Sequence, residues 1–404
     1  MIQPAASLEP TEIGARMDGV IRPTAQTPAI AEAFLPSPCP QNHAANLTVL
    51  PGGDLACVWF GGTQEGLSDI DVYMSRLPAG GQQWETPVRL SGDPERSEQN
   101  PVLFPAPDGR LILLHTAQRS GHQDGAIVRL RISEDGGRSF GAAGTLPTEL
   151  GTFVRQPIVV NGRGEWLLPV FFCRARPGKA WAGEDDSSGV LISPDEGRTW
   201  RRADVPGSLG AVHMNIVPLG GDEMVAVYRS RYADTIRMSR SSDGGSSWTA
   251  PHPLDLPNNN SSIQMIRLRS GRLALIYNHS HAGNAQERRL SLYDDIGDAD
   301  ALASEAAVAE EQTRPAAFWG APRSPLGIVT SDDAGRSWGE PAVLETGSGY
   351  CMTNNSKDRL NREFSYPSIV QGEDGTIHAA FTYYRQAIKY LRIPEALLSI
   401  PSRS

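Results

Sequence analysis

Pairs of short apolar segments, joined by a glycine-containing turn, recur along most of the chain. In the first pair, at residues 46–50 and 57–60, Leu, Val, Trp and Phe dominate. Apolar segments of this length, bounded by turn residues, are typical of β-strands, and two in succession predict a hairpin. The other pairs lie at 101–104 and 111–115, 156–160 and 167–171, 213–217 and 224–228, 263–267 and 273–277, and 366–370 and 377–381. Six copies of one unit indicate a repeat architecture.

A second motif, Ser-x-Asp-x-Gly-x-x-aromatic, lies between these hairpins. Its Asp can accept hydrogen bonds from nearby backbone N–H groups and close a turn, its Gly adopts a positive φ, and its aromatic ring packs between sheets. We therefore expect these Asp residues to be structural. A worn copy at Leu77–Trp84 has Ala79 in the Asp position, and the complete copies are Ser133–Phe140, Ser193–Trp200, Ser241–Trp248 and Ser331–Trp338.

The two interleaved motifs predict an all-β protein, a six-bladed β-propeller of four-stranded antiparallel sheets. We expect the propeller to span residues 36–393, after an N-terminal extension at 1–35 and before a tail at 394–404. The last blade would close with strands from both chain ends, which leaves no long exposed edge. Residues 293–322 interrupt the rhythm, and helix-forming residues at 298–314 predict a small helical insertion there.

Composition narrows the function classes. The 41 Gly and 31 Pro among 404 residues favour many short elements joined by turns. The net charge is −9 and no basic patch is visible, so we expect no nucleic-acid partner. No apolar segment approaches the ~18 residues of a membrane span, so we expect no membrane partner. The four Cys form no CxxC pair and predict reduced, mostly buried thiols. The N-terminus lacks a basic segment before an apolar one, so a cytoplasmic protein is expected unless a leader was removed.

Asp boxes interleaved with such hairpins resemble the sialidase (neuraminidase) superfamily of BNR-repeat proteins. Four stretches are similar to its bacterial branch: Val58–Gly66, Asn100–Phe104, Asp255–Asn260 and Phe364–Ile369. The resemblance covers about residues 36–393. It implies an exo-acting glycoside hydrolase that holds a substrate carboxylate with an arginine triad. It also implies a Tyr nucleophile activated by a Glu, with an Asp as acid/base.

The resemblance places several catalytic candidates. Tyr366 matches the nucleophile, and Arg229 matches one triad arginine. His213 stands where the family has its activating Glu, so an imidazole would have to accept the phenol proton. The acid/base belongs in the loop after the first hairpin, Gly61–Asp71, which offers Glu65, Asp69 and Asp71, and Glu65 and Asp69 are the preferred candidates.

The ends of the innermost strands of a propeller converge at one mouth of its channel, where propellers usually bind ligands. In this chain those ends are rich in Arg, His and Asn, which suits an anionic or polyhydroxylated ligand. We expect substrate binding by His43, Arg174, Asn260 and Arg385, with Arg362 as the alternative to Arg385 for a further triad arginine. We expect neither a metal nor a cofactor, and the oligomeric state is left open.

Three functions remain open on the sequence. The first is a sialidase-like exo-glycosidase acting on an acidic sugar, either sialic-acid-like or uronic, which a Tyr–carboxylate pair would favour. The second is a lyase or a non-sialic glycosidase that uses a His/Tyr pair facing a basic pocket. The third is a non-catalytic carbohydrate-binding propeller, which the absence of any titratable cluster at the mouth would favour. All three predict a carbohydrate or glycoconjugate partner.

Overall fold

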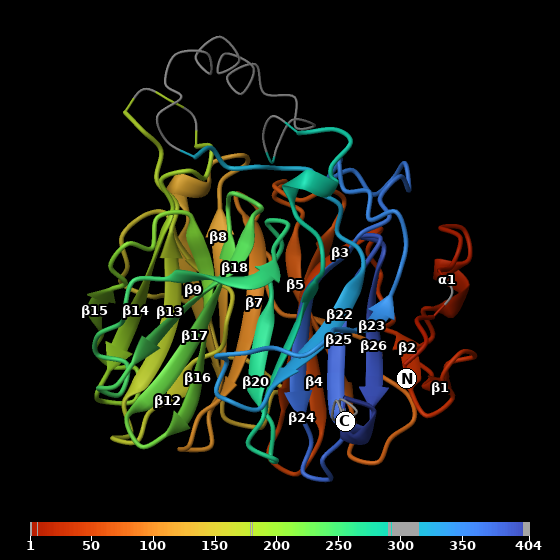
Figure 1. The fold of residues 1–404 in the computed structure, drawn as a ribbon, viewed down its shortest axis with the longest axis horizontal. Helices are drawn as coiled ribbons and strands as arrows, with labels where there is room; N and C mark the ends of the chain where they lie inside the picture. The colour runs from red at the N-terminus through yellow and green to blue at the C-terminus, as the bar shows by residue number, and fades with distance from the viewer. Residues whose placement is uncertain are drawn as a thin grey trace.

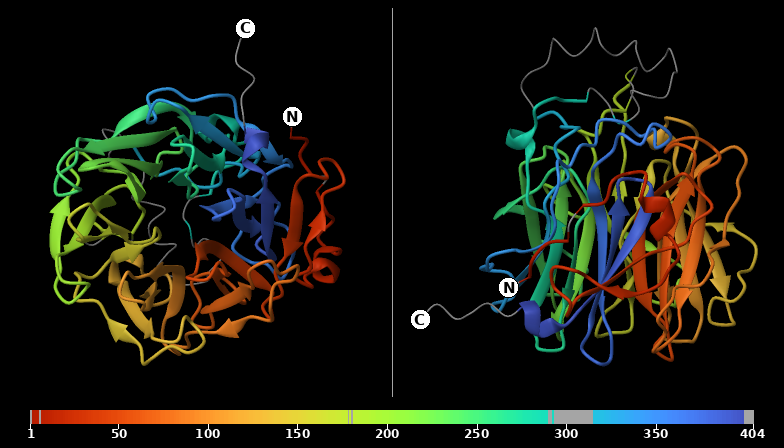
Figure 2. Two further views of the ribbon diagram at one scale, coloured as in Figure 1. Left: turned by 90° about the horizontal axis from the view of Figure 1, so that it is seen from below. Right: turned by 90° about the vertical axis from the view of Figure 1, so that its right-hand side faces the viewer.

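The computed structural model describes residues 2–5, 7–177, 179, 181–289, 292 and 315–398. In these residues six antiparallel sheets stand around a central axis, seen from the side in Figure 1 and along the axis in the left view of Figure 2. The predicted six-bladed β-propeller is confirmed. The described helical segments are short: α1 (Ile13–Arg16) and 3₁₀ turns at Gln123–Gly125, Ala282–Asn284 and Glu395–Leu398.

Blades are numbered here in chain order, and their strands are given from the innermost outward. Blade 1 contains β3 (Gln41–Val49), β4 (Leu55–Gly62), β5 (Asp71–Leu77) and β6 (Val88–Arg89). Blade 2 contains β7 (Ser97–Pro105), β8 (Leu111–Gln118), β9 (Ile127–Ser133) and β10 (Gly144–Thr145). In blade 3 the innermost strand is split into β11 (Thr152–Val154) and β12 (Val159–Val160), which both pair with β13 (Trp166–Phe172); β14 (Ser187–Ser193) and β15 (Arg201–Asp204) follow.

The second half of the ring repeats this order. Blade 4 contains β16 (Ala211–Gly220), β17 (Glu223–Ser230), β18 (Thr235–Ser241) and β19 (His252–Pro257). Blade 5 contains β20 (Gln264–Arg267), β21 (Leu273–Asn278), β22 (Leu326–Ser331) and β23 (Ala342–Glu345). Blade 6 contains β24 (Phe364–Gln371), β25 (Ile377–Tyr383), β26 (Ala387–Ile393) and, from the other end of the chain, β2 (Ala31–Phe34) and β1 (Arg22–Pro23).

Blade 6 closes the ring with strands from both ends of the chain, as the sequence predicted. Strand β2 pairs antiparallel with β26, so the segment predicted as an N-terminal extension supplies the outer strands of this blade. The pairing is reinforced by buried Lys389 on β26, which donates to Glu32 on β2 at 2.8 Å. Lys389 also donates to Glu345 on β23 and so links blade 6 to blade 5. An outer edge that would otherwise be open is thus covered by the chain itself.

The Asp boxes close turns and pack blades together. In the first complete copy, Asp135 accepts hydrogen bonds from the backbone N–H groups of Arg138 and Ser139, both at 2.9 Å. The aromatic residue of a later copy, Trp248, is buried in the core between blades 3 and 4. The prediction that this motif is structural is confirmed by these contacts. All four Cys are free, and Cys57, Cys173 and Cys351 are buried, as expected.

Only part of the predicted insertion can be compared with the structure. Residues 293–314, which include the predicted helix, lie outside the described residues. Residues 315–322 are described and contain no helix; Trp319 forms an isolated β-bridge with Arg289. Among the helices of the described chain, none is long and apolar enough to cross a membrane.

Candidate functional site

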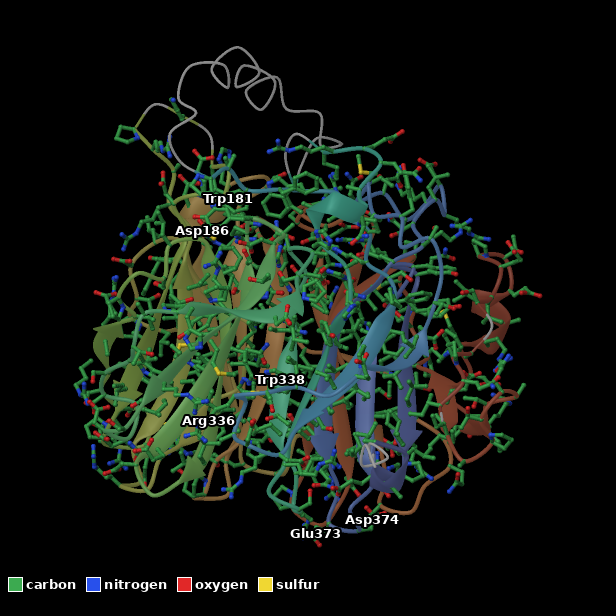
Figure 3. The ribbon with its side chains drawn as sticks, viewed as in Figure 1. Trp181, Asp186, Arg336, Trp338, Glu373 and Asp374 are labelled. Carbon is green, nitrogen blue, oxygen red and sulfur yellow. The ribbon has the colours of Figure 1, made fainter. Side chains whose placement is uncertain are left out.

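The innermost strands β3, β7, β11, β16, β20 and β24 line a channel on the propeller axis. In Figure 3, Glu373 and Asp374, on the turn that follows β24, lie at one end of the propeller, and Trp181 and Asp186 lie toward the other. Strand β24 therefore begins near the end that carries Trp181 and Asp186. We call this end the mouth.

Irregular backbone near the mouth positions the channel residues. The ladders of β3, β7, β16 and β24 with their neighbours each contain a register shift close to the strand start. Left-handed backbone recurs at the equivalent places, with a positive φ at Ala44, Asn100, His213, Asn260 and Tyr366. Such a conformation costs a non-Gly residue about 1–3 kcal/mol, and bulges re-aim side chains away from regular alternation. The strain is thus concentrated where side chains from different blades meet.

Tyr366 and Arg229 form the centre of this meeting point. Arg229 Nη1 donates to the Tyr366 hydroxyl at 2.6 Å, and Arg229 Nε donates to Asn260 Oδ1 at 2.7 Å. These residues come from blade 6, blade 4 and the entry to blade 5, and all are buried. Fixing one guanidinium between a phenol and an amide orients its remaining N–H groups.

Two histidines flank the phenol. The ring centroid of His43 lies 4.3 Å from that of Tyr366, and the centroid of His213 lies 5.7 Å from it. His213 Nε2 is 3.4 Å from Arg229 Nη1, and His43 Nδ1 is 2.9 Å from Thr382 Oγ1. Burial, together with the surrounding arginines, lowers the pKa of both imidazoles well below the usual 6.5. Both rings are therefore neutral near pH 7.

A chain of buried ion pairs borders the site on the blade 6 side. Glu363 accepts from Arg323 Nη1 at 2.6 Å and also from Arg385 Nε, and Arg385 Nη1 donates to Glu65. Burial opposes ionisation of Glu363, but Arg385 and Arg323 outweigh it and lower its pKa to about 2. The guanidinium carbon of Arg323 lies 5.6 Å from the Tyr366 ring centroid, so this chain reaches the phenol.

Arg155 and Arg229 differ from these arginines because, among the described residues, neither forms an ion pair with a carboxylate. Burial lowers the pKa of Arg155 to about 10 and that of Arg229 to about 9, so both stay charged near pH 7. A buried charge without a counter-ion is costly. The arrangement therefore favours an anionic ligand beside Tyr366.

The channel is closed beneath Tyr366. Arg155 Nη2 donates to the carbonyl oxygens of Ala45 and Tyr366, at 3.0 and 3.1 Å, and so links blade 3 to blades 1 and 6. Deeper along the strands, Gln264 donates to Gln156 at 3.1 Å and accepts from the Ile369 N–H at 2.6 Å. These buried cross-channel bonds form a floor beneath Tyr366.

The rim above Arg229 contains a second buried ion pair. Arg231 donates to Asp186 at 2.6 and 2.9 Å, and the Trp181 indole donates to the same carboxylate at 2.9 Å; both labelled residues lie at the mouth in Figure 3. Trp319 covers the guanidinium groups of Arg229 and Arg231, with its ring centroid 5.9 and 5.3 Å from their central carbons. These contacts hold one wall of the site.

Most of the predicted site residues come together. Tyr366, His213, His43, Arg229 and Asn260 form the cluster itself. Arg385 and Glu65 lie at its border, bound to each other. Glu65 was predicted as an acid/base candidate, and its side chain forms an ion pair with Arg385.

Two predicted residues lie away from the cluster, which corrects the expectation for them. Asp69 is exposed and accepts a hydrogen bond from the Thr63 N–H at 3.0 Å, on the opposite side of the loop from Glu65. Arg174 is exposed, forms an ion pair with Glu149 at 3.2 Å and covers Phe172. In both cases the chain turns the side chain outward. The alternative triad arginine, Arg362, instead donates to nearby backbone carbonyls.

Three residues near the cluster were not among the predicted site residues: Arg155, Arg323 and Glu363. Arg155 stands at the start of the third hairpin. This position, at an end of an innermost strand, was the sequence feature from which its place near the site could have been predicted. Glu363 stands three residues before Tyr366, directly ahead of β24. Arg323 precedes β22, which is not an innermost strand, and no sequence motif indicates its role. In the described residues, no group of three or more His, Cys, Asp or Glu is arranged to hold a metal ion.

Comparisons with solved structures agree with this fold. The chain is similar to the Hadza microbial sialidase Hz136, with TM-score 0.64 and 13% identity over 89% of this chain and 66% of that one. It is similar to the NanB sialidase from Streptococcus pneumoniae, with TM-score 0.64 and 12% identity over 89% and 69%. A protein of unknown function from Dyadobacter fermentans gives TM-score 0.61 and 16% identity over 87% and 95%. The chain thus spans about two thirds of each of these two sialidases, and identities this low show the fold alone.

The search of curated proteins gave no sequence match. The family model for the BNR repeat-like domain matches residues 53–379, which is most of the propeller. The chain belongs to the BNR repeat-like domain family.

Proposed function

We propose that the protein is a sialidase-like exo-glycosidase that cleaves an acidic sugar from the end of an oligosaccharide. The observation that carries the proposal is Arg229, a buried arginine that has no carboxylate partner among the described residues and donates to the Tyr366 hydroxyl. A guanidinium that lacks an internal counter-ion suits a substrate carboxylate. The floor beneath Tyr366 supports exo-action, because a polysaccharide cannot pass through the channel at that point.

In the proposed reaction, Tyr366 Oη attacks the anomeric carbon and the bond to the leaving oxygen breaks. The phenol proton passes to a neutral imidazole, for which His213 is the candidate because it contacts the same Arg229 Nη1 as the phenol. Positive charge from Arg229 stabilises the negative charge that develops on the phenol oxygen. Water then attacks the anomeric carbon of the glycosyl–tyrosine intermediate, and the bond to Tyr366 Oη breaks. The imidazolium returns its proton to the phenolate, and the proton lost by the water neutralises, through the solvent, the leaving-group anion released in the first step.

The site differs from the family pattern in the acid that would protonate the leaving oxygen. Among the described residues, no carboxylic acid hydrogen-bonds to Tyr366, and Glu65 is paired with Arg385. Leaving groups that need no proton should therefore react much faster than alkoxides. We expect 4-nitrophenyl glycosides to be cleaved well and methyl glycosides of the same sugar poorly.

The test is hydrolysis of 4-nitrophenyl α-sialoside, and of the corresponding β-glucuronide, by the purified protein. Tyr366→Phe should lower kcat by roughly 10³-fold or more, because the nucleophilic oxygen is lost. Tyr277→Phe is the matched control, since it removes a hydroxyl that bonds His279 outside the channel. Absence of release from both substrates would contradict the proposal.

One observation favours a second candidate, a lyase that acts on a uronate. A histidine instead of a carboxylate lies beside Tyr366, and Arg229 with Asn260 would neutralise the uronate carboxylate. An imidazole would take the C5 proton, the electrons would form the C4=C5 bond, and the C4–O bond would break as Tyr366 protonated the leaving oxygen. Ultraviolet absorbance from an unsaturated product, without hydrolysis, would establish this candidate. Binding without either product would leave a non-catalytic carbohydrate-binding propeller.

A further inference from the structure

A separate, solvent-open cavity lies on blade 1. Its volume is about 480 Å³, within the roughly 300–1,000 Å³ typical of ligand pockets. Its walls come from the segment before β3, the loop between β4 and β5, strand β5 and the segments around β6. The side chains that give it chemistry are Cys39, Asp69, Asp71, Tyr73, Arg89 and Asp93.

One loop separates this cavity from the channel. Gly62, Thr63, Ser68 and Asp69, between β4 and β5, line the cavity. Glu65, on the same loop, points the other way and pairs with Arg385 at the border of the channel site. The cavity is therefore a neighbour of the candidate active site and not a part of it.

Asp71 is a buried carboxylate that the protein satisfies only in part. Its residue surface is 6% exposed, and its Oδ2 accepts from Arg89 Nη1 at 3.2 Å. Among the residues that the structure describes, Arg89 is the one hydrogen-bond donor to this side chain. Burial outweighs Arg89 and raises the pKa of Asp71 to about 6. A ligand that donates hydrogen bonds to the Asp71 carboxylate would supply the donors that the protein does not provide.

Rigid apolar surfaces adjoin this carboxylate. The Tyr73 ring stacks on Trp59 with a centroid separation of 6.2 Å, and the Trp59 indole is fixed by a 2.8 Å hydrogen bond to Asn42. Pro38, Pro40 and Pro94 form further walls with restricted backbones. A preformed pocket loses little entropy when a ligand binds.

The charges of the cavity select the kind of ligand. Asp69, Asp71 and Asp93 face Arg89 in the lining, and Asp93 is paired at 2.9 Å with Arg129. Because the carboxylates in the lining offset the arginines, the cavity offers no net electrostatic attraction to an anion. A neutral sugar fits it, because hydroxyl groups donate to carboxylates and accept from a guanidinium, and the C–H face of the ring packs on tyrosine and proline.

We propose that this cavity is a second carbohydrate site that binds a neutral monosaccharide unit. Asp69 and Asp71 accept hydrogen bonds from its hydroxyl groups, and Arg89 donates to its oxygens. The site operates by binding alone, so it stands whether or not the channel is catalytic.

The experiment measures binding of methyl β-galactoside, methyl α-glucoside, methyl α-mannoside and N-acetylglucosamine by saturation-transfer NMR, up to about 50 mM, which detects millimolar affinity. At least one sugar should bind. Arg89→Gln and Asp71→Asn should each weaken binding at least fivefold. Asp108→Asn, on the turn between β7 and β8, and Tyr366→Phe, in the channel, should leave it unchanged. The Arg89 side chain is largely exposed, so that variant keeps the test valid if Asp71→Asn unfolds.

Three results would overturn the proposal. No binding by any of the four sugars is the first. Binding that Tyr366→Phe abolishes and Arg89→Gln leaves intact is the second, since the sugar would then occupy the channel. The third is a response of the cavity residues to Ca²⁺ alone and to none of the sugars, which would make the carboxylates a cation site. Sialoside hydrolysis is measured in a separate assay. Failure of the sugar-binding test therefore does not bear on the proposed hydrolysis, and failure of hydrolysis does not bear on sugar binding.

Discussion

Two pairs of buried arginines surround Tyr366, and they differ in what neutralises them. Arg323 and Arg385 share Glu363, and Arg385 also pairs with Glu65. Arg155 and Arg229 bond only to neutral groups in the described structure: carbonyls, hydroxyls, the Asn260 amide and, at a longer distance, an imidazole. The first pair has carboxylate partners within the fold, and the second pair has none among the described residues.

The difference separates structural from binding roles among residues of one type. A paired arginine stabilises the protein in the absence of ligand, and its loss mainly affects folding. An arginine without a counter-ion carries a cost in the free protein that an anionic ligand repays. Stability and binding should therefore respond in opposite ways on the two sides of the channel.

The largest expected effect is on the paired side. Glu363→Gln keeps the shape of the side chain but leaves Arg323 without its carboxylate partner and Arg385 with Glu65 alone. We expect the free energy of unfolding to fall by about 3–5 kcal/mol, measured by urea denaturation. A fall below about 1 kcal/mol would show that the pairing contributes little, and the comparison would fail on this side.

The next effect concerns the unpaired side. Asn260→Asp places a carboxylate beside Arg229 and converts it into a paired arginine. Binding of N-acetylneuraminate or glucuronate, measured by calorimetry, should weaken ten- to a hundredfold, which corresponds to about 1.4–2.8 kcal/mol. The stability of the free protein should stay the same or rise. Unchanged affinity would mean that Arg229 does not hold the ligand carboxylate.

The pH dependence of stability tests the neutral histidines between the two sides. His43 and His213 are held neutral in the folded protein, whereas in the unfolded chain they take up protons below about pH 6.5. The folded state then binds fewer protons, so stability falls as the pH falls from 6.5 toward 5. His213→Gln should reduce this slope by about 1.4 kcal/mol per pH unit. An unaltered slope in urea titrations at several pH values would contradict a neutral, buried His213.

The smallest effect is stabilisation by ligand. An acidic monosaccharide at five times its dissociation constant should stabilise the protein by about 1 kcal/mol, seen as a rise in Tm. Asn260→Asp should remove the rise, and Asp108→Asn, an exposed control, should keep it. A rise of equal size in both variants would place the anion elsewhere.

The fold could be predicted from the sequence because its determinants are local and repeated. Each Asp box contains the carboxylate, the glycine and the aromatic residue that one turn requires, and Asp135 shows how the carboxylate is used. Tyr366, His213, Arg229 and Asn260 could be predicted in part for the same reason: they stand at the ends of the repeated hairpins.

The remaining site residues depend on contacts that no local pattern encodes. Arg323 reaches Tyr366 from a segment before β22, and its role follows from its pairing with Glu363, forty residues later. Glu65 and Asp69 lie on one short loop, and only the three-dimensional path of that loop turns one toward Arg385 and the other to the surface. Arg174 leaves the channel because Glu149 and Phe172 hold it outside.

The floor formed by Arg155, Gln156 and Gln264 also determines the order of events at the site. Because the floor blocks the channel beneath Tyr366, a bound ligand has to leave on the mouth side before the next ligand can enter. A polymer cannot thread through and advance by one unit. Under the proposed function, each encounter therefore ends in complete dissociation, and free acidic sugar in the surroundings competes directly with the next chain end.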